Sequence, residues 1–244
     1  MNDYMVETRG LSKRYRRNGP LALQSLNLQV SRGSLFGFVG PNGAGKTTML
    51  NLLTGITHAD EGRVIFDGAD ISRRPPDQRC LAGLGRTYQI PKPFEGMTVF
   101  ENVLVGGTYG RGRPEKASYE LCARALHRAS LLPRANVLAE SLSLLERKRL
   151  ELARALATEP KVLLLDEIAG GLTEREVQSV IETIKQLRAE GISIIWIEHI
   201  VHALMAVVDR LMAIDFGHLI AEGDPKTVIN SPEVRDVYMG SLMV

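Results

Sequence analysis

The sequence has little cysteine, no long apolar run and no apolar N-terminal segment. Two cysteines, Cys80 and Cys122, among 244 residues are too few for a disulfide framework and suit a reducing compartment. The longest uncharged apolar stretches, such as GISIIWI and Val201 to Val208, fall short of the roughly 20 residues that a membrane-spanning helix needs. The first ten residues, MNDYMVETRG, lack the apolar core of a secretory signal. These absences predict a cytoplasmic protein that reaches any membrane through partners.

Neither sign of charge dominates. Thirty Lys and Arg residues stand against 28 Asp and Glu residues, so the net charge does not require nucleic acid or an acidic membrane surface as a partner. The basic run KRYRR is interpreted as a solvated surface. A chain of this length can bury a sizeable core, which predicts one large domain or a domain that carries a subdomain.

Hydrophobic patterns separate strand-rich from helix-rich parts of the chain. Residues 4–30 tend to alternate, as in LALQSLNLQV, which indicates half-buried antiparallel strands. HADEGRVIFDGADI predicts a hairpin that turns at Asp67 and Gly68, and RRPPDQRC is expected to interrupt regular structure at Pro75 and Pro76. From about Phe94 to Thr158 helical patterns dominate, with GGTYGRGRPE as one loop-like interruption.

The remaining runs alternate between buried strands and helices. SLFGFVG, KVLLLDE and GISIIWIE fit buried strands, and TTMLNLLTGI and REVQSVIETIKQLRAE fit helices; RLMAIDF, a hairpin and a helical tail follow. This order predicts an α/β fold with a parallel sheet. We expect a core with a β lobe, formed by residues 1–93 and 159–244, and an inserted helical subdomain at residues 94–158.

A glycine-rich loop joins the first buried strand to the first helix. GPNGAGKT fits the pattern G-x-x-x-x-G-K-[ST] in full. In such a loop the backbone N–H groups surround phosphates, the lysine reaches the β and γ phosphates, and the hydroxyl after it ligates Mg²⁺. The following helix adds its positive end, so the loop predicts binding of a nucleoside triphosphate. The residues expected to hold it are Gly40, Pro41, Asn42, Gly43, Ala44, Gly45, Lys46, Thr47 and Thr48.

An acidic pair ends the strand KVLLLDE. Asp166 lies where parallel sheets gather ligands and is expected to hold Mg²⁺. Glu167 could polarise the water that attacks the γ-phosphate; the alternative is that the pair caps the next helix. About 120 residues, including the helical insertion, separate Lys46 from Asp166, whereas a small kinase or GTPase would keep these elements closer.

Four motifs in this order resemble those of the ATP-binding cassette (ABC) ATPases, over nearly the whole chain. They are GPNGAGKTT, Gln89 in RTYQIPKPFEGMTVFEN, LLLDE, and His199 in WIEHI. More narrowly, RTYQIPKPFEGMTVFENV, KRLELARAL and EGDPKTVINSPEVRDVYMG resemble the ATPase subunits of branched-chain amino acid importers. The ATPases of lipopolysaccharide export are also similar and are the nearest alternative assignment.

The resemblance implies a role for several single residues. Gln89 would contact Mg²⁺ and the attacking water, and His199 would contact the γ-phosphate and hold Glu167 in place. Tyr15, in LSKRY, would stack on adenine. On their own, a glutamine, a histidine or an aromatic residue is more often a packing or surface residue than a ligand.

The segment that follows Ser141 departs from the family. The family signature, LSxGQ or LSxGE, faces the ATP of a second subunit, whereas this chain reads LSLLE, with Leu145 at the glycine position. Ser143 and Glu146 have capping-box spacing, which predicts a helix that starts at Ser143. Either Leu145 points away and the site with the partner's ATP works, or the signature is degenerate and that ATP site is slow or merely structural. Ile168 and the segment GGLT also differ from the family, although Thr173 could simply cap the next helix.

The resemblance implies an ATP-hydrolysing transporter subunit that uses ATP and Mg²⁺. Its expected cargo is branched-chain amino acids or related small organic solutes. Its expected partners are a second ATPase subunit, identical or different, two integral membrane permeases and an extracytoplasmic solute-binding protein, and not nucleic acid. Such a complex would hold the chain at the cytoplasmic face of the inner membrane. A non-transport switch that dimerises on ATP remains an alternative. A nucleotide kinase would need acceptor-binding elements, and the set of Gln89, Ser143 and His199 argues against that enzyme class.

Overall fold

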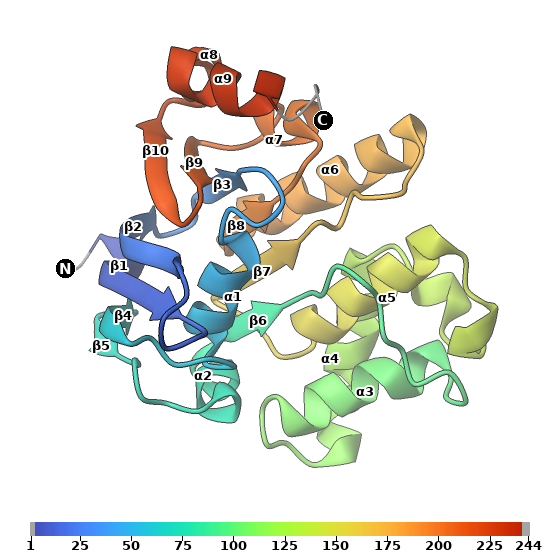
Figure 1. The fold of residues 1–244 in the computed structure, drawn as a ribbon. Helices are drawn as coiled ribbons and strands as arrows, with labels where there is room; N and C mark the ends of the chain where they lie inside the picture. The colour runs from blue at the N-terminus through green and yellow to red at the C-terminus, as the bar shows by residue number, and fades with distance from the viewer. Residues whose placement is uncertain (1–2, 241–244) are drawn as a thin grey trace.

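Two β-sheets of different kinds form the frame of the computed structural model, which describes residues 3–240 (Figure 1). The first sheet is antiparallel, in the order β2-β1-β4-β5, with β1 at Tyr4–Arg14, β2 at Leu21–Ser31, β4 at Glu61–Phe66 and β5 at Ala69–Asp70. The second sheet has the order β10-β9-β3-β8-β7-β6, with β3 at Leu35–Val39, β6 at Leu84–Arg86, β7 at Val162–Asp166, β8 at Ser193–Ile197, β9 at Arg210–Asp215 and β10 at His218–Gly223. Its strands are parallel except β10, which pairs antiparallel with β9. The predicted α/β fold and antiparallel β lobe are confirmed.

Helices cover the larger sheet and connect its strands. They are α1 (Lys46–Thr54), α2 (Pro76–Ala82), α3 (Val99–Tyr109), α4 (Glu115–Arg128), α5 (Leu144–Leu156), α6 (Glu174–Ala189), α7 (Val201–Met205), α8 (Pro225–Asn230) and α9 (Pro232–Gly240), with short 3₁₀ turns at Leu132–Arg134 and Ala139–Ser141. Within residues 3–240 no helix combines the length and the apolar character needed to cross a membrane.

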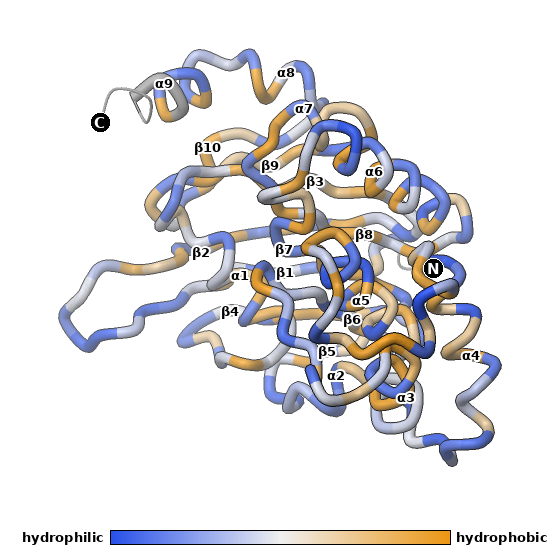
Figure 2. The backbone as a smooth tube through the Cα atoms, turned by 90° about the vertical axis from the view of Figure 1, so that its right-hand side faces the viewer, coloured by the Kyte–Doolittle hydropathy of each residue, from blue (hydrophilic) through white to orange (hydrophobic). Residues whose placement is uncertain are grey.

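The larger sheet is buried on both faces. Val162 and Leu164 of β7 belong to one hydrophobic cluster, with α1 and the antiparallel sheet. Leu163 and Leu165 belong to a second cluster, with helices α3 to α6. Alternate residues of a strand point to opposite faces, so a continuous apolar run such as VLLL is what a doubly covered strand requires. Hydrophobic residues accordingly concentrate along the central strands, while peripheral connections are mostly hydrophilic (Figure 2).

Helices α3, α4 and α5 contact one another and lie to one side of the sheets (Figure 1). A capping box between Thr98 and Glu101 starts α3. The predicted loop GGTYGRGRPE is shorter than expected, because Gly106 to Tyr109 complete α3. The subdomain boundaries at residues 93/94 and 158/159 stay a prediction, and the outer limits of the predicted unit, residues 1 and 244, lie outside the described residues.

Two turn predictions have different outcomes. The β4–β5 hairpin turns at Asp67 and Gly68, both with positive φ, as a tight two-residue hairpin turn requires. The expected break at Pro75 and Pro76 is wrong in part, because α2 begins at Pro76. Proline is well suited to the first position of a helix, where its missing N–H has no helical partner to lose.

Helix α2 also supports the phosphate-loop helix. The buried Arg79 of α2 donates hydrogen bonds to the carbonyl oxygens of Leu52 and Leu53, at the end of α1, and to those of Ser72 and Arg74. The last carbonyls of a helix lack helical partners, so this guanidinium supplies hydrogen-bond donors to the C-terminal end of α1.

Candidate nucleotide site

The loop between β3 and α1 is held tightly against the antiparallel sheet. Gly45 has φ 108°, and a Cβ atom at this residue would lie 2.5 Å from the carbonyl oxygen of Ala22 in β2. Only glycine fits such a close approach without strain. The loop therefore turns directly into α1, whose first N–H groups have no partners within the helix.

Lys46 closes the loop from the inside. Its Nζ atom donates to the carbonyl oxygens of Gly40 at 2.6 Å and Pro41 at 2.9 Å. Burial lowers the pKa of Lys46, and the charges of Glu167 and Asp166 oppose that shift. The first turn of α1 and this cation together favour an anion at the loop.

A cavity of about 220 Å³ opens on this loop. Its lining joins the loop, Ala22, Gln89 and Glu167, which are far apart in the sequence. The structure therefore brings together the phosphate loop and two of the three predicted catalytic side chains. Thr47, the expected magnesium ligand of the loop, is exposed on this cavity.

Glu167 lies between the other two predicted catalytic residues. Its Oε2 atom accepts a hydrogen bond from Nε2 of Gln89 at 2.5 Å, and its Oε1 atom lies 2.7 Å from Nε2 of His199. The backbone of Glu167 is left-handed, with φ 49°, and its N–H donates to the carbonyl of Ile197 at 2.9 Å. A residue other than glycine rarely has a positive φ, and here the carboxylate lies toward Gln89 and His199.

Asp166 has a partner that the sequence did not indicate. Its Oδ2 atom lies 2.9 Å from Nη2 of Arg86, and the two side chains are 6% and 7% exposed. Arg86 also donates to Asn51 of α1 at 2.7 Å. Sequence reasoning singled out neither Arg86, although it begins the RTYQ segment, nor Asn51, because their contacts depend on the pairing of β6 with β7 and on the packing of α1.

The donor set near the loop fits Mg²⁺. The Thr47 hydroxyl, the Asp166 carboxylate and the Gln89 amide oxygen are hard oxygen ligands, and Mg²⁺ sites typically combine one or two such protein ligands with water and substrate phosphates. One oxygen of Asp166, Oδ2, is engaged by Arg86.

Tyr15 lines a second cavity, of about 380 Å³, which adjoins the first. Both cavities include Ala22 and Gly43 in their linings. Tyr15 is 57% exposed, and its hydroxyl lies 3.4 Å from Oγ1 of Thr48. Phe216, in the turn between β9 and β10, lines the same cavity and was not singled out from the sequence, because a lone aromatic residue before a glycine carries no signal.

The segment at the family-signature position forms the start of α5. Ser143 caps the helix and forms the predicted capping box with Glu146. Leu145 is partly buried and packs against the hydrophobic cluster, whereas its neighbour Leu144 is 45% exposed. Among the described residues that line the cavity at the phosphate loop, neither Ser143 nor Leu145 is present, so this segment lies apart from the chain's own loop.

Helix α5 nevertheless contacts the acidic pair. The buried Lys148 donates from Nζ to the backbone carbonyl of Glu167 at 2.9 Å. Of the other departures from the family, Ile168 is buried and packs in the core. Thr173 is the N-cap of α6 and shares a capping box with Glu176, which confirms the capping interpretation of this residue.

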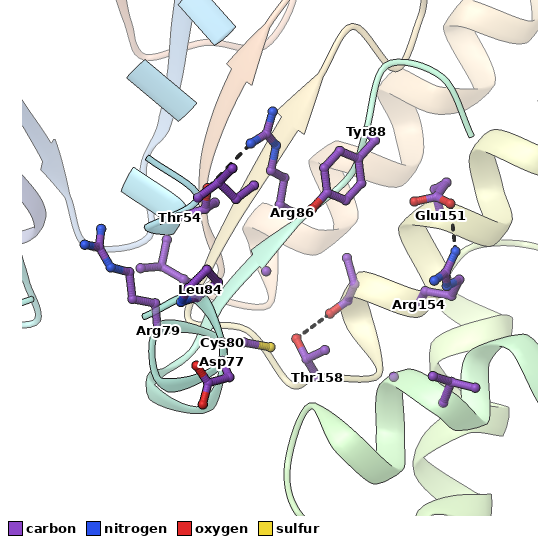
Figure 3. Close-up of a pocket in the computed structure, with 16 residues that line it drawn as sticks. Thr54, Asp77, Arg79, Cys80, Leu84, Arg86, Tyr88, Glu151, Arg154 and Thr158 are labelled. Atoms are coloured by element: carbon purple, nitrogen blue, oxygen red, sulfur yellow. Dashed lines mark hydrogen bonds and ion pairs between the residues drawn. The ribbon is translucent and has the colours of Figure 1, made fainter. Parts of the chain in front are cut away.

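A groove of about 360 Å³ lies beside Tyr88, between the larger sheet and the helices α2, α3 and α5. Arg86 and Tyr88 face Glu151 and Arg154 of α5 across it (Figure 3). The guanidinium of Arg86 lies 4.9 Å from the ring centre of Tyr88, and that of Arg154 lies 5.1 Å from the ring centre of Phe94. The groove thus presents aromatic and charged groups next to the Gln89 segment.

Comparisons with known proteins agree with this geometry. A family model described as "ABC transporter" matches residues 23–170. A probable branched-chain amino acid transport ATP-binding protein, LivG of Archaeoglobus fulgidus, is 35% identical over 97% of this chain and 96% of its own length. A lipopolysaccharide export system ATP-binding protein, LptB of Acidithiobacillus ferridurans, is 32% identical over 97% of both chains.

The crystal structure of a nucleotide-free ATP-binding cassette from an ABC transporter is 30% identical in sequence. It superposes with a TM-score of 0.89 over 96% of this chain and 98% of its own. The chain therefore belongs to the ABC transporter family as an ATP-binding cassette, and ATP hydrolysis is the activity characteristic of that family.

Proposed function

We propose that this chain powers the import of branched-chain amino acids or related small organic solutes by hydrolysing ATP. The observation that carries the enzymatic part is the position of Glu167, held between Gln89 and His199 and exposed to the cavity at the phosphate loop. The proposed cargo rests on the likeness to the amino acid transport protein, which is higher in identity than the likeness to the lipopolysaccharide export protein.

Each group at the cavity has a proposed task. The loop N–H groups and Lys46 bind the β and γ phosphates, and Tyr15 stacks on the adenine. Thr47, Asp166 and Gln89 hold Mg²⁺, which supplies positive charge to the phosphate oxygens. Glu167 polarises the attacking water, while His199 fixes the orientation of Glu167 and contacts the γ-phosphate.

The proposed assembly has two cassettes and two membrane permeases. Two cassettes, identical or different, would enclose ATP between the phosphate loop of one and the Ser143 segment of the other. That Ser143 and Leu145 lie apart from their own loop supports this arrangement. The groove at Tyr88 would receive the permease, which would place the chain at the cytoplasmic face of the membrane, and a solute-binding protein would deliver the cargo.

The substitution Glu167→Gln tests the enzymatic part of the proposal. Glutamine keeps the shape and one oxygen acceptor but accepts no proton, so we expect hydrolysis to fall by at least about a hundredfold. The dissociation constant for ATP should stay within about threefold of the native value, since the phosphate contacts come from the loop and Lys46. Turnover is measured by phosphate release and binding by calorimetry.

The matched control is Glu182→Gln, which makes the same change at an exposed residue of α6. It should leave turnover and binding unchanged. Near-native turnover by the Glu167→Gln chain would remove Glu167 from the mechanism.

A further inference from the structure

The turn between β9 and β10 holds an exposed aromatic side chain beside the phosphate loop. Phe216 is 80% exposed and has a left-handed backbone, with φ 43°. A bulky residue rarely adopts this conformation, because its Cβ atom crowds the backbone. An aromatic residue that is both strained and exposed contributes little to packing within the chain. The position of this side chain is therefore better explained by contact with a bound ligand.

Hydrogen bonds fix this turn to the nucleotide site. The N–H of Gly217 donates to the carbonyl of Ala44 in the phosphate loop at 2.9 Å, and the N–H of Gln24 in β2 donates to the carbonyl of Gly217 at 2.8 Å. A Cβ atom at residue 217 would lie 3.0 Å from backbone atoms of Ala22 and Leu23. The backbone of the turn is therefore held against both β2 and the loop, and it presents Phe216 beside the phosphate cavity.

The cavity that Phe216 lines has the properties of a site for a flat apolar group. Tyr15 and Phe216 contribute rings from two distant segments, and Pro20, Leu21 and Ala22 contribute aliphatic surface. Its volume of about 380 Å³ lies within the range of small-molecule pockets. Because it shares Ala22 and Gly43 with the cavity at the phosphate loop, one nucleotide could place its base here and its phosphates there.

We propose that Phe216 contacts the nucleobase of the bound nucleotide and forms, with Tyr15, the apolar walls of the base site. This inference rests on the proposed function, since it concerns the same nucleotide site. Aromatic side chains bind bases through their π faces and favour them whatever the base's hydrogen-bonding pattern. Phe216 thus contributes to affinity for the base and has no contact with the phosphates.

The test compares a ligand with a base and a ligand without one. Binding of ATP and of inorganic tripolyphosphate, both with excess Mg²⁺, is measured by calorimetry on the native chain and on Phe216→Ala. We expect the dissociation constant for ATP to rise about tenfold or more, which is the effect of losing one base-stacking contact. The dissociation constant for tripolyphosphate should change less than about twofold, and Phe216→Tyr should restore ATP affinity.

The control is Leu219→Ala, which removes an exposed apolar side chain from the same hairpin and should alter neither constant. If Phe216→Ala does not fold, Phe216→Leu takes its place with the same expected direction. Unchanged ATP affinity would overturn the inference while leaving the proposed function intact, and so would equal weakening of both ligands, which would assign the effect to the loop. A native chain that binds neither ligand would instead overturn the proposed function.

Discussion

At the scale of single residues, a buried carboxyl group beside the candidate site sets a pH dependence. Glu198 is 1% exposed and lies between β8 and His199. Burial raises its pKa from 4.5 to about 7, although hydrogen bonds from the Ala169 N–H and the Trp196 indole and the charge of Lys148 act in the opposite direction. The carboxyl group therefore changes charge near neutral pH.

This shift predicts how stability varies with pH. Because the pKa of Glu198 is higher in the folded chain than in the unfolded chain, the folded state binds this proton more tightly. The contribution is fully present below pH ~4.5 and is lost as the pH rises through ~7, by about 3 kcal/mol in total. We expect Glu198→Gln, which cannot lose a proton, to reduce the fall in unfolding free energy between pH 5.5 and 8, as measured by urea denaturation.

The control for that experiment is Glu182→Gln, at an exposed position of α6, which should keep the native pH profile. Equal slopes for the native chain and the Glu198→Gln chain would show that Glu198 does not carry the effect.

Residues in sequence motifs were predictable, and their partners were not. Lys46, Gln89, Glu167 and His199 stand at fixed places in motifs, and the structure brings them to one site. Arg86, Asn51 and Phe216 reach that site only through strand pairing and the packing of α1, which a local sequence pattern does not encode. The sequence therefore predicts the residues proposed to act on the nucleotide, and it predicts less well the residues that contact them.

At the scale of elements, the packing of helix α5 bears on the two interpretations of Leu145. The packing of Leu145 on the hydrophobic cluster favours the interpretation in which it points away from a partner's ATP. Leu145→Gly should therefore lose about 2 kcal/mol of unfolding free energy, from lost burial and from glycine in a helix. Turnover per folded chain, measured over a wide range of chain concentrations, should stay within about twofold of native, since no obstruction is removed.

The matched control is Leu144→Gly, at the exposed neighbour on the same helix. It should lose less than about 1 kcal/mol, the cost of glycine inside a helix, because Leu144 is exposed and is the first residue of α5. A tenfold or larger gain of turnover in Leu145→Gly would instead favour the degenerate signature, in which a different ATPase subunit completes the working site.

The helices and strands show which sequence signals are sufficient to predict an element of secondary structure. The capping boxes of α5 and α6 and the β4–β5 turn are local, so a few residues predict them. Strand β6 has only three residues, Leu84–Arg86, and exists because β7 pairs with it. Helix α2 was missed because its proline was interpreted as a break, although proline is compatible with the first turn of a helix.

At the scale of the whole molecule, the groove at Tyr88 predicts that the chain binds integral membrane proteins. A tagged chain extracted with mild detergent from the cells in which it occurs should be recovered with integral membrane proteins. Tyr88→Asp places a charge at a half-exposed aromatic position of the groove and should lower that recovery about tenfold, as the loss of an aromatic interface residue does.

The control is Tyr109→Asp, at an exposed tyrosine that ends α3 and is not part of the groove lining among the described residues. A native chain recovered without membrane proteins would favour the alternative of a soluble ATP-dependent switch. Uptake of labelled leucine is measured in the same cells. Loss of this uptake on Lys46→Ala would support amino acid import rather than lipid export.

The buried side chain of Arg86 contacts both the candidate nucleotide site and the groove at Tyr88. Its guanidinium neutralises Asp166 at the phosphate loop, and it lies over the ring of Tyr88 in the groove. Breaking a buried ion pair leaves an uncompensated charge, so a ligand that draws Arg86 toward the groove must also alter the affinity of the Asp166 carboxylate for cations. By reciprocity, a cation at Asp166 alters the affinity of the groove for its ligand by the same factor. A groove ligand that displaced Arg86 would therefore couple occupancy of the groove to occupancy of the phosphate loop.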